Sequence, residues 1–519
     1  MRDKISQAMD LFAHERYFRL RLFFQGILVG IGTGLVISLF RFSLELADGL
    51  RPRLYDFLRQ ASPLWLGMYL VLLLAAAALI AWIVQREPGC TGSGLPQLKG
   101  ILLGRLHMPW ASVLGWKLVS CIVALGAGMS LGRAAPSCAM GGCVGQGVGR
   151  ILGSSRAEER FLLAAGAAAG LGSTFNAPLA GVLFCLEEMT KSFSPFLLLA
   201  ALAAAVSASA VTEGFFGSAA IFHIGGIPIL PLELYGLLLL QGLFVGALGA
   251  FFTRQLIFSL DWYDRWLPGR YVRYALPFCL TGVVGFWLPE IQGGGNQLVD
   301  LLAGAHYGLA FLFLLFAAKL FFTMVCFGPG IPGGIFLPML ALGALGGAFF
   351  SEGAAALGWL DTMYVPTLVA FGMAAYFAAV VKAPVTGSVL VLEMTGSFGH
   401  MLPLICVSMA AYIAADLLHG KPVYEALLNR SLERQERVRT AVRRHRVMLE
   451  LLVGEGSSLS GVQLRQSALP PHALLVNVMR GGVQQPPEPE MLLLAGDLLY
   501  ILTDDADINA LEDMARETQ

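Results

Sequence analysis

The stretch Gly132-Arg-Ala-Ala-Pro136, followed by Gly141 and Gly145, decides the fold because its pattern occurs twice in the chain. Its glycines and proline each have an identical counterpart 202 residues later. These counterparts are Gly334, Pro338, Gly343 and Gly347. Glycine permits close backbone approach and proline opens helices at the first turn, so the pattern indicates two similar helix starts.

A second pair of segments keeps nearly the same register. The run 176–181, which leads to Glu187-Glu188-Met189-Thr190, is echoed about 206 residues later by 382–387, which leads to Glu393-Met394-Thr395. We therefore predict two related halves, at about 21–230 and 231–430. Short segments broken by glycine and proline at matching places are typical of transporters whose site lies between the repeats.

The composition indicates a polytopic membrane protein. Of 519 residues, 56% are hydrophobic and 13% charged, with a mean hydropathy of +0.69, whereas soluble domains have about 25% charged residues. Lys+Arg and Asp+Glu balance at 35 each, which argues against nucleic-acid binding. The cysteines and histidines form no C-x-x-C or H-E-x-x-H pattern. We therefore expect no metal site, no catalytic residues, no cofactor and no enzymatic activity.

Many apolar stretches follow one another along the chain, and several are shorter than the roughly 20 residues that a spanning helix needs. They lie at about 22–40, 64–84, 110–127, 160–186, 196–212, 232–252, 275–288, 308–327, 335–350, 365–381, 385–394 and 402–418. Gly/Pro-rich breaks lie at 88–96, 128–145, 328–338 and 420–424. Irregular backbone is tolerated in a membrane only where it is buried or lines a site. We thus predict an all-α bundle of tilted and half-spanning helices with its pathway at these breaks.

Arginines flank the membrane region at both ends. Arg16, Arg19 and Arg21 precede the first span, and seven arginines lie between Arg430 and Arg446. By the positive-inside rule, both termini are predicted to face the cytoplasm. We expect the protein to lie in the plasma or inner cell membrane. The predicted domains are an N-terminal helix (1–20), the transmembrane domain (21–430), a basic linker (431–446) and a small α+β cytoplasmic domain (447–519). In the last, strands are expected at 447–453, 473–480 and 492–503.

The breaks have the chemistry of an anion site. Helix N-termini present amides without intrahelical acceptors and a partial positive charge. Ser93 and Tyr424 add hydroxyl donors that carry no full charge. Each hydrogen bond to a charged group is worth about 1.5–3 kcal/mol, so four or five donors hold an anion without binding it too tightly for release.

Across about 20–430 the chain resembles the CLC family of chloride channels and proton-coupled chloride exchangers. Segments 92–96, 132–136 and 334–338 are similar to the family's G-S-G-I-P, G-R-E-G-P and G-x-F-x-P motifs. Residues 165–189 resemble the stretch that ends at the exchangers' inner proton glutamate, and 421–424 resembles the segment with the pore tyrosine.

The resemblance implies a CLC-type inverted repeat and a homodimer in the bilayer with one anion pathway per subunit. Its chloride would contact the hydroxyls of Ser93 and Tyr424 and the amides of Ile335 and Phe336. Serine at position 93 favours chloride over fluoride or nitrate. Near the pore, Lys117, Arg133 and Glu187 are expected in structural and electrostatic roles, since lysine and arginine there raise the positive potential.

Ala134 departs from the family pattern at the gating glutamate. A methyl group neither competes with chloride nor carries a proton, so we expect passive, proton-uncoupled chloride conduction. Glu188 matches the inner proton-transfer position, although a residue solvated at the cytoplasmic face is an alternative interpretation. Ala134 fits either a natural loss or an engineered glutamate-to-alanine change in a parent chloride/proton antiporter, of which we prefer the second. Stoichiometric exchange and an anion-sensing receptor are the alternative functions.

The tail at 447–519 resembles the TrkA-C, or RCK C-terminal, type of regulatory domain. The resemblance lies in the glycine-rich turns of 454–461, in Arg480-Gly-Gly482 and in the Ala495-Gly-Asp497 turn. It implies a dimerising domain that binds a small ligand such as a cyclic dinucleotide, or one that stabilises the dimer without a ligand.

Overall fold

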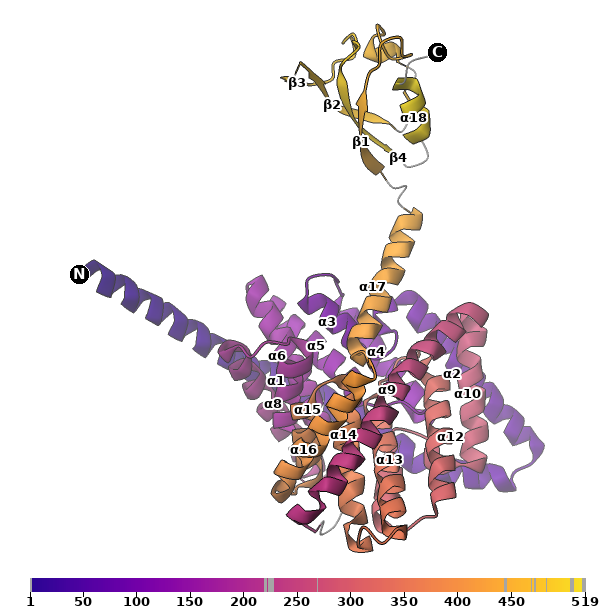
Figure 1. Ribbon diagram of the computed structural model, residues 1–519. Helices are drawn as coiled ribbons and strands as arrows, with labels where there is room; N and C mark the ends of the chain where they lie inside the picture. Colours follow the sequence, from indigo (N-terminus) through magenta and orange to yellow (C-terminus); the bar gives the residue numbers. More distant parts are fainter. Residues whose placement is uncertain are drawn as a thin grey trace. The chain divides into compact units, whose positions relative to one another are not determined.

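The computed structural model describes residues 2–218, 222, 228–267, 269–442, 446–467, 469–470, 473–481, 483–504 and 508–515. The chain forms two compact units, Met1–Leu428 and Asn429–Gln519. Figure 1 shows the first as a helical body and the second as a small sheet with one helix packed beside it. Residues 443–445 of the expected linker and Gly482 of the tail lie outside the described residues.

The first unit consists of two successive sets of eight α-helices within the described residues. The first set is α1 Arg2–Gln60, α2 Pro63–Arg86, α3 Leu95–Leu102, α4 Trp110–Gly126, α5 Ala134–Ile151, α6 Arg156–Phe175, α7 Pro178–Phe184 and α8 Pro195–Phe216. The second set is α9 Tyr235–Trp266, α10 Arg270–Trp287, α11 Asn296–Gly304, α12 Leu309–Phe327, α13 Phe336–Ala356, α14 Val365–Val381, α15 Pro384–Thr395 and α16 Met401–Leu417. The final helix, α17 Val423–Val442, follows them.

The two sets correspond helix by helix, as the repeat predicts. Helices α5 and α13 begin 202 residues apart, and α7 and α15 begin 206 residues apart. Backbone details repeat as well, since Gly94 and Gly295 each have a positive φ, of 86° and 103°, directly before a short helix. The two related halves predicted from the sequence are therefore the architecture of this unit.

Close helix packing depends on glycines at equivalent places in both halves. A Cβ atom on Gly141 of α5 would lie 2.1 Å from the carbonyl oxygen of Gly166 in α6. In the second half, a Cβ on Gly343 of α13 would lie 2.7 Å from the carbonyl oxygen of Gly372 in α14. Small residues at such crossings let helix backbones touch, which is how membrane helices gain packing energy without a hydrophobic driving force.

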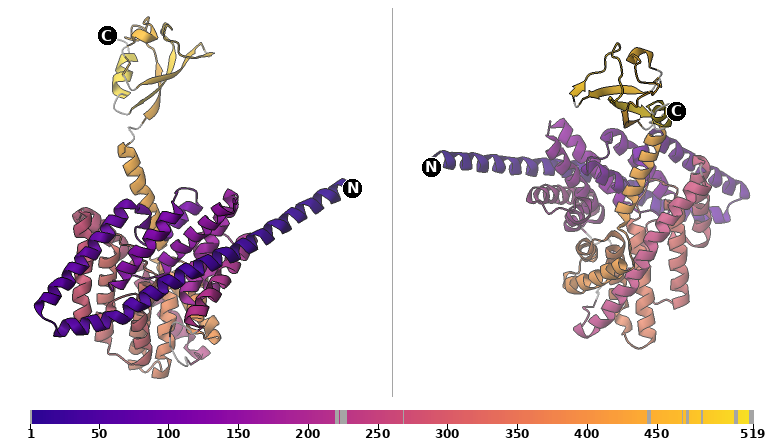
Figure 2. Two further views of the ribbon diagram at one scale, coloured as in Figure 1. Left: turned by 180° about the vertical axis from the view of Figure 1, so that it is seen from behind. Right: turned by 45° about the horizontal axis from the view of Figure 1, so that its top comes forward.

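Several expected boundaries were wrong. The N-terminal helix does not end at residue 20 but continues to Gln60, and α1 crosses the body diagonally (Figure 2), packing against α8 and α6. The predicted break 128–145 is a loop only as far as Arg133, because its glycines belong to the buried, tightly packed helix α5. The apolar stretch 160–186 is interrupted at Asn176, which ends α6 in a left-handed conformation. The short helices α3 and α11 were not among the apolar stretches expected from the sequence.

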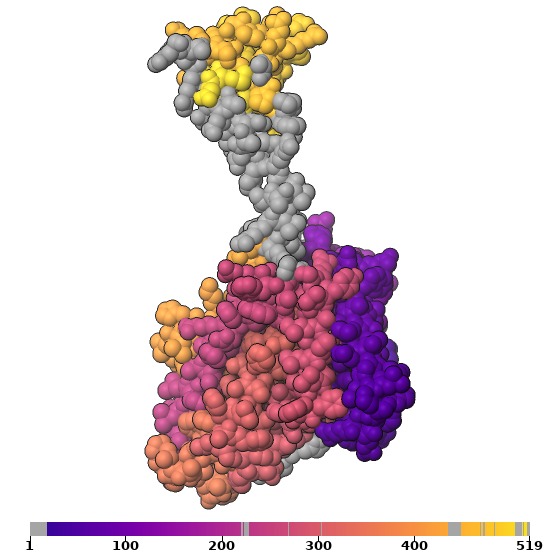
Figure 3. All heavy atoms as spheres, turned by 90° about the vertical axis from the view of Figure 1, so that its right-hand side faces the viewer, coloured from indigo at the N-terminus to yellow at the C-terminus, as the bar shows by residue number. Residues whose placement is uncertain are grey.

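Within the part of the chain that the structure describes, eight helices are long and apolar enough to cross a membrane. In α2 only a third of the most apolar window is buried inside the protein, which leaves leucines such as Leu64 and Leu72 exposed. In the space-filling view the early part of this unit, in indigo, lies against its middle part, in magenta and orange (Figure 3), where α2 packs on α10. Exposed apolar side chains of this kind match a lipid environment.

The second unit contains a four-stranded antiparallel sheet of order β1-β4-β2-β3 and helix α18. Its elements are β1 Arg446–Leu452, β2 Leu474–Arg480, β3 Val483–Gln485, β4 Leu498–Asp504 and α18 Ile508–Ala515. The predicted α+β class is therefore observed. The short strand β3 was not predicted, and the last long strand begins at Leu498 rather than residue 492, because residues 494–497 form a turn closed by Asp497.

Candidate functional site: convergent helix N-termini

Two glycines of equivalent sequence position join the halves at the site. The Gly132 amide donates to the Gly334 carbonyl oxygen at 2.6 Å, and the Gly334 amide donates to the Gly132 carbonyl oxygen at 2.9 Å. Helices α5 and α13 begin two residues beyond these glycines. The reciprocal pair thus fixes two helix N-termini side by side in the protein interior.

The loop that carries Ser93 is fastened to the same place. The Gly92 amide donates to the Gly330 carbonyl oxygen at 3.0 Å, and the Gly333 amide donates to the Gly92 carbonyl oxygen at 3.1 Å. The buried ammonium of Lys117 donates to the carbonyl oxygens of Cys90 and Gly92, at 2.9 and 2.6 Å. Because two of its three N–H donors are occupied by carbonyls, Lys117 orders this loop and adds positive charge close to it.

Tyr424 approaches the site from the start of α17 through aromatic contacts. Its ring meets that of Phe184 edge to face at 6.2 Å, and Phe184 meets Phe336 in the same way at 6.0 Å. Phe336 is also 4.8 Å from Phe377, between ring centroids. Tyr424 and Phe336 are therefore held against one shared ring, although they lie far apart in the sequence.

The hydroxyls of Ser93 and Tyr424 are buried and have no hydrogen-bond partner among the residues that the structure describes. Ser93 is 2% and Tyr424 1% exposed, and Ile335 and Phe336 are fully buried at the start of α13. Amides in the first turn of a helix have no intrahelical acceptor. A buried donor without an acceptor is costly, so this gathering of unused donors is suited to an anion.

Ala134 is the first residue of α5 and is fully buried. It lies two residues after Gly132, which pairs with Gly334 just before α13. Its neighbour Arg133 stands at the N-cap position, makes no capping hydrogen bond through its side chain, and is partly buried. The side chain at position 134 therefore brings neither charge nor a hydrogen-bonding group to this region.

Glu188 is not solvated, because it is 2% exposed. Its Oε1 atom accepts a hydrogen bond of 2.8 Å from the ammonium of Lys99 on α3. The burial rules out the alternative interpretation of a solvated helix end. Lys99 was not among the residues expected at the site, although a lone lysine within an apolar segment is a signal for a buried functional pairing.

Glu187 has a different role from its neighbour Glu188. Its Oε2 atom accepts from the Thr386 amide at 2.8 Å and from the Thr386 hydroxyl at 2.7 Å, at the start of α15. It is therefore a cap for a helix of the other half and has no contact with the hydroxyl donors of the site among the hydrogen bonds described.

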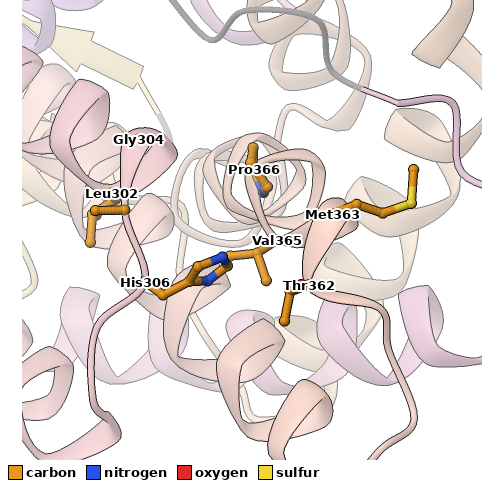
Figure 4. A pocket seen from close by; sticks show the side chains of 8 residues that line it. Leu302, Gly304, His306, Thr362, Met363, Val365 and Pro366 are labelled. Atoms are coloured by element: carbon orange, nitrogen blue, oxygen red, sulfur yellow. The ribbon is translucent and has the colours of Figure 1, made fainter.

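A separate pocket of about 270 Å³ lies between the end of α11 and the start of α14. Figure 4 shows His306 and Thr362 among its lining side chains, and His306 Nδ1 lies 2.8 Å from Glu352 Oε1. The pocket shares no residue with the convergent N-termini. Among the described residues, no cluster of three histidine, cysteine or acidic side chains is arranged for a metal ion.

Comparisons with known proteins agree with the two-unit organisation. The profile of the voltage gated chloride channel family matches residues 76–416, and that of the TrkA-C domain matches residues 448–516. The H(+)/Cl(-) exchange transporter ClcA of Vibrio cholerae is 38% identical over 427 residues, covering 80% of this chain and 90% of that protein. ClcA of Salmonella agona is 36% identical with the same coverage.

One solved structure, of a slow cyanobacterial Cl-/H+ antiporter, superposes with a TM-score of 0.76 at 31% identity, covering 80% of this chain and 99% of the antiporter. A eukaryotic CLC transporter shares the fold with a TM-score of 0.66 at 24% identity, covering 79% of this chain and 74% of the transporter.

Proposed function

Because this chain belongs to the voltage gated chloride channel family, we propose that it transports chloride across a membrane. The proposed ion site consists of the Ser93 and Tyr424 hydroxyls and the Ile335 and Phe336 amides. The observation that supports it most is that both hydroxyls are buried without a partner.

The hydrogen-bond donors of the site are suited to binding chloride weakly enough for it to be released again. A bare anion in a low-dielectric interior loses several kcal/mol of hydration free energy, and hydrogen bonds of about 1.5–3 kcal/mol each offset that loss. The two hydroxyls are neutral, and the ammonium of Lys117 is already bound to two carbonyl oxygens. The site therefore attracts chloride without a direct ion pair, which keeps release fast.

We propose that conduction is passive and uncoupled from protons. Position 134 holds a methyl group at the start of α5, where the family pattern has a carboxylate. An alanine cannot occupy an anion position or carry a proton, so nothing at this place exchanges one chloride for one proton. Lys117 and Arg133 stay structural in this proposal and raise the local positive potential.

Chloride/proton exchange is the second candidate. Two observations favour it: the curated relatives are named exchange transporters, and a glutamate is retained at position 188. Against an engineered origin of Ala134, the adjacent Ala135 also departs from the G-R-E-G-P pattern, so a single substitution does not account for the difference.

The remaining proposals concern assembly and regulation. We propose a homodimer in the cell membrane with both termini in the cytoplasm, and a TrkA-C tail that binds a small molecule such as a cyclic dinucleotide. Thermal-shift measurements of the full chain with and without a cyclic dinucleotide test the tail. An unchanged melting temperature would favour a tail that stabilises the dimer without a ligand.

Chloride efflux from liposomes tests the proposed function. Purified protein is reconstituted in chloride-loaded vesicles, and efflux is followed after addition of a potassium ionophore. Efflux that depends on the protein and falls on substitution of Ser93 supports the proposal. Chloride retention at the level of empty liposomes would contradict it and would leave the anion-sensing receptor as the function to examine.

A further inference from the structure

Lys99 and Glu188 form an ion pair inside the protein. The Lys99 Nζ and Glu188 Oε1 atoms are 2.8 Å apart, and the two side chains are 6% and 2% exposed. Lys99 comes from α3, and Glu188 from the π-helical turn Cys185–Met189. Charged side chains are rarely buried unless they are paired, so each of these two requires the other.

The pair links segments that carry residues of the proposed anion site. Helix α3 begins after Ser93 and carries Lys99 in its second turn. The Lys99 Nζ atom is also 3.8 Å from Oε1 of Glu425, the residue next to Tyr424. Lys99 thus connects the segments that carry Ser93, Glu188 and Tyr424.

Burial raises the pKa of Glu188, and the neighbouring charge that opposes burial most is Lys99, at hydrogen-bond distance; Lys191 also lowers this pKa, whereas Glu425 raises it. Lys191 forms its own ion pair with Glu425, and both of these side chains are more than a third exposed. Within the cluster the two cations and two anions cancel, and among the described side chains Lys99 is the one that forms an ion pair with Glu188. A proton added to Glu188 would therefore displace the Lys99 ammonium from its partner.

We infer that Lys99 is a fixed counter-ion that keeps Glu188 ionised and closes the inner proton position. This inference rests on the proposed chloride transport and deepens it: the pathway lacks a proton carrier at Ala134, and its inner carboxylate is paired with Lys99. Lys99 acts as a positioning residue, since it works through Glu188 and not on the ion. Restoring the outer carboxylate alone would then not restore proton exchange.

Flux measurements on A134E and on A134E/K99M test this inference in liposomes. Chloride efflux and proton uptake are recorded together, with proton movement driven uphill by the chloride gradient. We expect A134E alone to move few protons, and A134E/K99M to take up protons at least about tenfold faster, because the costly opening of a buried ion pair is removed. Uphill proton uptake by A134E alone, at a fixed ratio to chloride, would overturn the inference.

Two matched variants separate the contact from general charge effects. A134E/K191M removes the neighbouring, exposed lysine and should behave like A134E, whereas A134E/K99R keeps a cation beside Glu188 and should also move few protons. Absence of proton uptake in A134E/K99M, with chloride efflux intact, would overturn the assignment to Lys99. Loss of chloride efflux in the unmodified protein would instead refute the proposed function.

Infrared spectroscopy gives a second readout that needs no transport and no folded double variant. Spectra of the unmodified protein minus those of E188Q are recorded at neutral and at mildly acidic pH. We expect no protonated carboxyl band that E188Q removes, because Lys99 keeps Glu188 ionised. Such a band in the unmodified protein would overturn the inference.

Discussion

Glu187 and Glu393 each bind the start of a helix that belongs to the opposite half of the repeat. Glu187 Oε2 accepts from the Thr386 amide at 2.8 Å at the start of α15, and Glu393 Oε2 accepts from the Ala180 amide at 2.7 Å at the start of α7. Carboxylates complement both the unpaired amides and the positive end of the helix dipole. The two halves are therefore joined by a reciprocal exchange of helix caps.

This exchange predicts a coupled loss of stability. E187A and E393A should each lower the unfolding free energy by about 1–3 kcal/mol, because buried amides lose an acceptor. Both caps hold α7 and the turn that follows it against α15. The double variant should therefore lose less unfolding free energy than the sum of the losses in the two single variants. Melting of the detergent-solubilised protein measures this, with E290A, at an exposed glutamate, as control. A loss in the double variant equal to the sum of the two single losses would contradict the conclusion that both caps stabilise the same contact.

The glycine pair that joins α5 and α13 predicts intolerance to a methyl group. A Cβ on Gly132 would lie 2.9 Å from the Leu337 amide nitrogen, and a Cβ on Gly334 would lie 2.8 Å from the Ala135 Cβ. G132A should lower stability by about 1–3 kcal/mol, as overpacking does. G115A, on α4, is a matched control because no atom lies within 4 Å of its added Cβ. Equal melting temperatures for G132A and G115A would refute the close contact.

The unpartnered hydroxyls predict the strength of chloride binding. Loss of one hydrogen bond to an anion costs about 1.5–3 kcal/mol, so S93A and Y424F should each weaken chloride binding about ten- to a hundredfold. Isothermal titration calorimetry with sodium chloride measures this. Y263F removes a hydroxyl that donates to the Val325 carbonyl oxygen and should leave chloride binding unchanged. Unaltered chloride binding in both S93A and Y424F would show that these two hydroxyls do not bind the ion.

The tail has a pH dependence of definite sign. The Arg480 guanidinium donates to both carboxylate oxygens of Asp497, at 2.8 and 2.7 Å, and holds the pKa of Asp497 below its ordinary value. A lowered folded-state pKa contributes stability above about pH 4 that is lost as the pH falls through the lowered value.

Hydrogen exchange of the strand amides in the full chain measures this dependence. Protection of β4 should fall as the pH drops below about 4, once intrinsic exchange rates are corrected for. D497N should reduce protection at neutral pH and flatten its dependence on pH. Protection in D497N equal to that of the unmodified chain at neutral pH would contradict the role of Asp497.

The fold was predictable from the sequence where glycine and proline recur at equivalent positions of the two halves. Gly132 and Gly334 lie at equivalent positions, and the structure pairs them directly. The sequence indicated a helix start at 132–136 but not the extent of α5, because the glycines up to residue 145 were interpreted as a break, whereas the structure shows them in close helix contacts such as that of Gly141 with Gly166. Equally, the short helices α3 and α11 are too brief for a periodic pattern to be recognised.

The site was predictable in its donors but not in its ion pair. Ser93 and Tyr424 follow from their place beside the breaks, and their roles at the ion remain predictions. The repeat also shows where the halves differ, since the second-half residue equivalent to Ser93 is Gly294 and offers no hydroxyl. The contact between Lys99 and Glu188 joins residues 89 positions apart, and no local pattern predicts it.

Passage of chloride without protons is tested most directly by recording the movement of both ions in the same vessel. The unmodified protein is reconstituted in liposomes, and a chloride electrode and a pH electrode record together after a potassium ionophore is added. We predict rapid chloride efflux with no proton movement against its gradient. Proton uptake in fixed ratio to chloride would contradict the account, because coupling would then survive with alanine at position 134 and with Glu188 bound to Lys99.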